Sequence, residues 1–113
     1  MKKFLYLIIL CLFYSCKSDA QLAMERGIQF FDWKKYEDAV LEFNKAKYLQ
    51  LIHSDESYES LKLLAQTHYN LAITHAKLVN LIKANEEANR AFTLIPKPEY
   101  QELLDLIHQQ QSK

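Results

Sequence analysis

Glycine and proline are scarce in this chain, with one Gly and two Pro among 113 residues. Tight β-hairpin turns and phosphate-binding loops need glycine, because they place the backbone at positive φ or directly against a ligand. The shortage argues against a β-sandwich, a dinucleotide-binding domain and a P-loop. An all-α domain is the fold class that the composition favours.

A surplus of charge of either sign is also missing, since 14 Lys and Arg residues balance 14 Asp and Glu residues. Domains that bind nucleic acid carry a basic patch, and disordered tails often carry a net negative charge. We therefore expect neither a nucleic-acid-binding surface nor an acidic disordered tail. Half of the residues are hydrophobic, and the length suits one small globular domain.

The chain begins with the pattern of an export signal. Met1, Lys2 and Lys3 form a short basic start, and residues 4–14 form an uncharged run of eleven residues. A run of this length suits the apolar region of a signal peptide and falls short of the about 20 residues that a bilayer-spanning helix needs. We therefore expect a cleaved signal segment rather than a transmembrane helix.

The end of this run, Ser15-Cys16, resembles the cleavage site of a bacterial lipoprotein signal, in which a small residue precedes the acylated cysteine. The resemblance implies that residues 1–15 are a lipoprotein signal peptide and that a lipid on Cys16 anchors the exported protein in the cell envelope, on the periplasmic side or at the cell surface. Phe13 and Tyr14 depart from the usual signal, so an ordinary secretory signal with an incidental Cys16 is the alternative. The mature domain then has no cysteine pair for a disulfide.

Apolar residues recur at the three-to-four spacing of helices through the rest of the chain. We interpret residues 16–20 as a short polar tether and residues 21–113 as one helical domain. Within that domain the pattern predicts two helical hairpins and a C-terminal capping helix: about residues 20–53, about residues 54–96 and about residues 98–110.

Helix-capping residues and prolines stand at the expected boundaries. Ser54 or Ser57 can cap the first helix of the second hairpin, and Asn80 can cap its second helix. Pro96 ends that hairpin, and Pro98 suits the first turn of the final helix.

The two predicted hairpins repeat each other at a constant spacing of 45 residues. Small residues recur at the positions where two antiparallel helices approach most closely, and a large side chain there would force the helices apart. These small residues are Gly27, Ala39 and Ala46 in the first hairpin and Ala72, Ala84 and Ala91 in the second.

On these residues the chain resembles the tetratricopeptide-repeat (TPR) family. The family signature is matched by Gly27, Phe30, Tyr36, Ala39, Phe43 and Ala46 in the first copy and by Leu71, Ala72, Ala84, Ala91 and Pro96 in the second. The resemblance implies two packed hairpins of a right-handed α-solenoid. Because the family period is about 34 residues, about eleven residues between Tyr48 and Ser60 are extra, and we expect them to lengthen the first helix of the second copy.

The resemblance also implies a binding surface, since TPR proteins bind through the concave face formed by the first helix of each repeat. The matching positions are Gln21, Met24, Ile28, Phe31 and Asp32 in the first copy and Gln66, Tyr69, Asn70, Ile73 and Lys77 in the second. Most are apolar, which favours an apolar or amphipathic peptide anchored by Phe31, Tyr69 and Ile73. Asn70 and Lys77 alone do not rebuild the carboxylate-binding site of chaperone-type members.

The main hypothesis is therefore a non-enzymatic protein–protein interaction or scaffold module anchored in the envelope. The alternative is a structural subunit whose apolar concave face is buried in a homodimer or a larger envelope complex. An enzyme or small-ligand carrier is disfavoured, because the residues available assemble no nucleophile with its base.

We predict neither a cofactor nor a metal. His68 and His75 lie about 10.5 Å apart along one helix, too far to share an ion. The carboxylate pairs Glu86-Glu87 and Asp55-Glu56 are interpreted as solvated helix faces or first-turn charges.

Overall fold

The computed structural model describes residues 2, 3, 5 and 18–113. Residues 18–113 form five α-helices without a strand: α2 (Asp19–Asp32), α3 (Tyr36–Ile52), α4 (Tyr58–Lys77), α5 (Leu81–Leu94) and α6 (Pro98–Gln111). The predicted all-α fold with two hairpins and a further C-terminal helix is confirmed. Cys16 and most of the predicted signal peptide lie outside the described residues.

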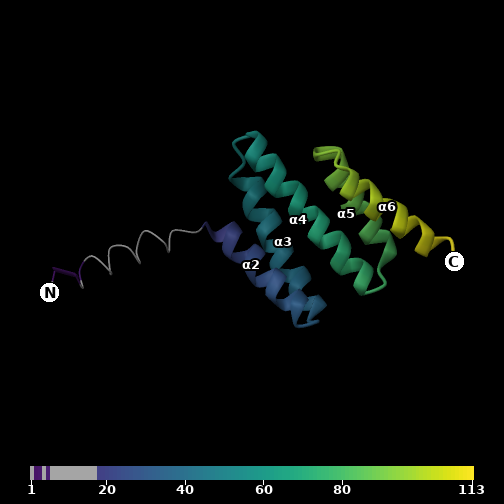
Figure 1. Cartoon of the computed structure of the whole chain (residues 1–113), viewed down its shortest axis with the longest axis horizontal. Coiled ribbons are helices and arrows are strands. Elements are labelled where there is room, and N and C mark those ends of the chain that lie inside the picture. Colours follow the sequence, from purple (N-terminus) through teal and green to yellow (C-terminus); the bar gives the residue numbers. More distant parts are fainter. Residues whose placement is uncertain (1, 4, 6–17) are drawn as a thin grey trace.

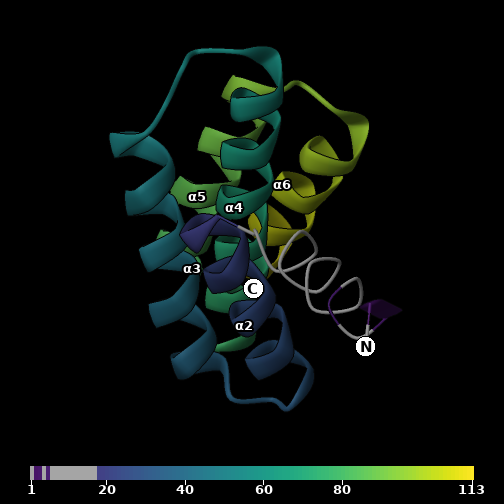
Figure 2. The same ribbon diagram turned by 90° about the vertical axis from the view of Figure 1, so that its left-hand side faces the viewer.

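Each helix packs on the next one in the chain, and the contact between α3 and α4 joins the two hairpins. Figure 1 shows the α2–α3 hairpin beside the α4–α5 hairpin, with α6 following at the C-terminal side. In the turned view of Figure 2, α3 and α5 lie towards the left, and α2 and α6 lie towards the right. This two-layer stacking of hairpins is a TPR-like fold.

Small buried residues allow the helices of each hairpin to approach closely. Ala39 and Ala46 in α3 and the equivalent Ala84 and Ala91 in α5 are fully buried. Gly27 faces the ring of Phe43 so closely that a Cβ atom at this position would lie 2.5 Å from Phe43 Cε1. The 45-residue register of the sequence is therefore also the register of the packing.

The turns within the two hairpins have the same backbone geometry. Lys34 and Val79, 45 residues apart, both adopt a left-handed conformation, with φ of 61° and 59°. In each turn the next N–H donates to the carbonyl five residues earlier at 2.8 Å: Lys35 to Phe30 and Asn80 to His75. This is the hydrogen bond of a Schellman motif, so the equivalence of the repeats extends to the main chain.

The extra residues between Tyr48 and Ser60 lengthen the helices on both sides of the connection between the two copies. α4 has 20 residues where α2 has 14, as predicted for a lengthened helix, but α3 also has 17 residues where α5 has 14. Ser57 caps α4 by accepting a hydrogen bond from the Ser60 N–H at 3.1 Å. Asn80 occupies the N-cap position of α5 without a side-chain capping bond, contrary to the prediction.

The first helix begins within the segment predicted to be a tether. Ser18 Oγ accepts from the Gln21 N–H at 3.2 Å, and Gln21 Oε1 accepts from the Ser18 N–H at 3.4 Å. This capping box starts α2 at Asp19, so residues 19 and 20 belong to the first helix rather than to the predicted tether. Among the described residues, no helix combines the length and the apolar character needed to cross a membrane.

Replacing Gly27 with Ala tests the close α2–α3 contact, because two effects of opposite sign compete. In an ordinary helix interior, Gly→Ala stabilises by about 0.5–1 kcal/mol. Here the new methyl group would meet the Phe43 ring, and overpacking costs about 1–3 kcal/mol. We therefore expect a lower melting temperature by circular dichroism, and a smaller loss when Phe43→Leu is also present. A rise in melting temperature would contradict the contact.

Candidate functional site

An apolar groove, here called the α2–α4 groove, lies between the first helices of the two repeats. It has a volume of about 240 Å³ and is lined by Ile28, Phe31, Phe43, Gln66, Asn70 and Ile73. Ile28 is 43% exposed, and Phe31 and Ile73 are half-buried. The groove thus combines apolar walls with the amides of Gln66 and Asn70.

Helical spacing places these side chains together. Ile28 and Phe31 are three residues apart on α2, whereas Gln66, Asn70 and Ile73 follow one another at four- and three-residue steps on α4. Residues at such spacings share a helix face. The Phe31 ring also contacts the Tyr36 ring edge-on, with centroids 5.2 Å apart. This contact with Tyr36 supports the position of the Phe31 ring in the groove wall.

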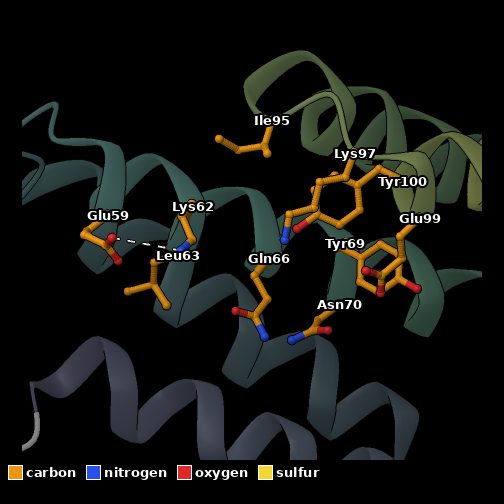
Figure 3. A pocket seen from close by; sticks show the side chains of 10 residues that line it. All are labelled: Glu59, Lys62, Leu63, Gln66, Tyr69, Asn70, Ile95, Lys97, Glu99 and Tyr100. Carbon is orange, nitrogen blue, oxygen red and sulfur yellow. Dashed lines mark ion pairs between the residues drawn. The ribbon is translucent and has the colours of Figure 1, made fainter.

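A second hollow, here called the α4–α6 hollow, adjoins the groove and shares Gln66 and Asn70 with it. It has a volume of about 410 Å³, and Figure 3 shows its ten side chains, which come from α4, from the α5–α6 connection and from the start of α6. Two lysines and two glutamates make it more polar than the groove: Lys62, Lys97, Glu59 and Glu99.

Tyr69 lies in the α4–α6 hollow rather than beside Phe31. Its ring packs on the ring of Tyr100, with centroids 5.0 Å apart and an interplanar angle of 36°. Burial raises the pKa of Tyr69, and the nearby Glu99 carboxylate raises it further. The Tyr69 hydroxyl therefore stays protonated and can donate a hydrogen bond.

The remaining residues predicted on the concave face do not line these two hollows. Met24 is buried in the core, with its sulfur 3.3 Å from Thr67 Oγ1, so its placement on the binding face was wrong. The neighbouring helix α4 covers it. Lys77 and Asp32 are exposed at helix ends, and Gln21 belongs to the capping box. The predicted concave-face residues that the fold brings together are Ile28, Phe31, Gln66, Asn70 and Ile73.

A partly buried charge network connects the two repeats on the other side of α4. Glu87 on α5 accepts from His68 Nδ1–H at 2.5 Å through Oε2 and from Lys47 Nζ at 3.5 Å through Oε1. The side chains of His68 and Glu87 are only 6% and 13% exposed. The sequence-based interpretation of Glu87 as a solvated charge was therefore wrong, because its partners come from helices distant in the sequence.

The network holds Glu87 in its charged form. Burial would raise the pKa of Glu87, but the hydrogen bond from His68 and the positive charge of Lys47 outweigh burial and lower it below 4.5. For His75, burial lowers the pKa below 6.5. In the described part of the chain, His75 Nδ1 is buried without a hydrogen-bond partner, and no cluster of three or more potential metal ligands occurs.

No protein-family model and no curated protein matches this chain. Among solved structures, the chain is similar to the "First TPR of Spaghetti (RPAP3) bound to HSP90 peptide SRMEEVD", with 18% sequence identity and a TM-score of 0.43. The match covers 84% of this chain and 94% of that chain. The two hairpins of this chain are TPR-like in their own packing and turn geometry.

The Glu87 network makes folding stability depend on acid in a defined direction. When the pH falls to about 4.5, the unfolded chain binds a proton at Glu87 before the folded protein does, so stability is lost from there downward. Protonation of unfolded His75 has the same effect as the pH falls through about 6.5.

Urea unfolding of Glu87→Gln across this pH range tests the network. We expect a loss on the order of 1–3 kcal/mol at neutral pH, because Lys47 and His68 keep no carboxylate partner, and a shrinking difference from the wild type below pH 4.5. Glu86→Gln, an exposed neighbour, serves as the control. A wild-type protein and a Glu87→Gln variant that lose stability in parallel on acidification would contradict the lowered pKa of Glu87.

Proposed function

We propose that this protein is a non-enzymatic interaction or scaffold module that binds an apolar or amphipathic peptide in the α2–α4 groove and is held in the cell envelope by a lipid on Cys16. The observation that carries the binding proposal is the groove itself. Ile28, Phe31 and Ile73 present an accessible apolar surface on the layer formed by α2, α4 and α6.

The dimensions of the groove favour the side chain of a peptide over a free small molecule. Pockets that enclose drug-sized ligands measure about 300–1,000 Å³ and bury most of the ligand, whereas this groove measures about 240 Å³ and is open. One large apolar side chain can fill such a space. The amides of Gln66 and Asn70 can both donate to and accept from the adjoining peptide backbone.

The envelope location is proposed from the N-terminal sequence. The basic start, the short apolar run and Ser15-Cys16 resemble a lipoprotein signal, and helix α2 follows closely, with its cap at Ser18. Each buried CH2 group of an acyl chain contributes about 0.8 kcal/mol to membrane binding. Two or more chains on one cysteine would therefore hold the domain at the membrane without a transmembrane helix.

Peptide binding is tested with a peptide selected from a random phage-displayed library on the purified protein. Ile28→Ser should weaken its binding at least about tenfold, because about 1.4 kcal/mol or more of apolar contact is lost. Ile82→Ser makes the same change at an exposed position on α5, outside the groove, and should leave the affinity unchanged. Fluorescence anisotropy of the labelled peptide measures both.

The contacts are expected to be apolar, so binding should persist when the salt concentration is raised. Equal losses in the Ile28→Ser and Ile82→Ser variants, or release by salt alone, would contradict the groove as the binding site. A stable dimer in size-exclusion chromatography that Ile28→Ser dissociates would instead favour the structural-subunit alternative.

Acylation is tested by metabolic labelling with a lipid precursor. Cys16→Ala should abolish labelling and release the protein from the membrane fraction. Cys11→Ala, the matched change within the apolar run, should keep both the lipid labelling and the membrane association. Labelling that survives in Cys16→Ala would refute the lipid anchor.

A further inference from the structure

The outer face of α3, which points away from α2 and α4, is unexpectedly apolar for a helix on the surface. Leu41, Tyr48, Leu51 and Ile52 are between 54% and 68% exposed. Their spacing of seven, three and one residues places them along one face of the helix. Lys45 and Asn44 are exposed beside them.

The second repeat provides an internal comparison for this face, because α5 occupies the same position in its hairpin. At the buried positions the two helices agree in kind, as Ala39 and Ala84 illustrate. At the outer positions they differ: Glu86 is equivalent to Leu41 and Thr93 to Tyr48, whereas the exposed Ile82 of α5 is equivalent to the exposed Glu37 at the start of α3. The packing of the repeats therefore does not require Leu41 and Tyr48 to be apolar, so contact with something outside the domain would explain them.

The apolar face of α3 ends close to Ser18, the first residue of the described helical domain. Ser18 and Asp19 line a cavity of about 370 Å³ together with Leu49 and His53 from the end of α3. Cys16 lies only two residues before Ser18, and two residues of extended chain span at most about 7 Å. A lipid on Cys16 would therefore hold this end of α3 next to the bilayer surface.

We propose that the outer face of α3 lies on the membrane surface, with Tyr48, Leu51 and Ile52 at the boundary between headgroups and acyl chains. This inference rests on the proposed lipid anchor. Tyrosine is suited to this boundary, because its ring is apolar and its hydroxyl is hydrated. The Lys45 stem can lie along the apolar surface while its ammonium group reaches the headgroups.

The proposed orientation also determines where the groove opens. Figure 2 shows α3 at one side of the molecule, with α2 and α4 further from that side. The α2–α4 groove is lined by α2, by α4 and by Phe43, which lies on the opposite face of α3 from Leu41 and Tyr48, so a membrane under the outer face of α3 leaves the groove away from the bilayer. The apolar side chains, rather than basic residues, make the contact, so zwitterionic lipid is sufficient. One helix face would then attach the domain while the opposite layer binds its peptide.

Photo-crosslinking of the full chain in the membranes of cells that produce it tests this orientation. The photoreactive residue benzoylphenylalanine replaces Tyr48, whose exposed ring it resembles in size, or the equivalent Thr93 on α5 as the matched control. After irradiation, mass spectrometry identifies what each position has bound. We expect a phospholipid adduct at position 48 and none at position 93.

The other outcomes overturn the inference and separate it from the anchor. A protein adduct at position 48, with a second copy of this chain or with another protein, identifies α3 as a protein interface. A membrane-bound protein without a lipid adduct at position 48 contradicts the orientation while leaving the anchor intact. An unmodified wild-type protein found in the soluble fraction contradicts the anchor, and the proposed orientation with it.

Discussion

Close approach of the two helices within each hairpin is the constraint on which the rest of this structure depends. Buried alanines on α3 and α5, and Gly27 beneath the Phe43 ring, leave little space between paired helices. The second hairpin joins this unit through the packing of α4 on α3. Side chains of α2, α3 and α4 then line the α2–α4 groove.

Most of the fold could be predicted, because helical periodicity and the 45-residue repeat are local properties of the sequence. The same regularity placed Ile28, Phe31, Asn70 and Ile73 on one surface. Met24, one turn before Ile28, was misplaced because Thr67 of the neighbouring helix covers it. Contacts of this kind depend on the rotation and offset of the packed helices, and the spacing of residues along one helix does not contain that information.

The same limit explains why the pairing of Glu87 with His68 and Lys47 was not predicted. Its three members lie on three different helices and belong to both repeats. The contact of His68 with Glu87 lies within the second hairpin. The contact of Lys47 with Glu87 links the first hairpin to the second.

Nuclear magnetic resonance of the protein with a bound library-selected peptide tests the central claim most directly. We expect nuclear Overhauser effects between an apolar side chain of the peptide and the methyl groups of Ile28 and Ile73. The side-chain amides of Gln66 and Asn70 should shift in the same titration. Contacts confined to α3 or α5, with no change at these four residues, would contradict the claim that the α2–α4 groove binds the peptide.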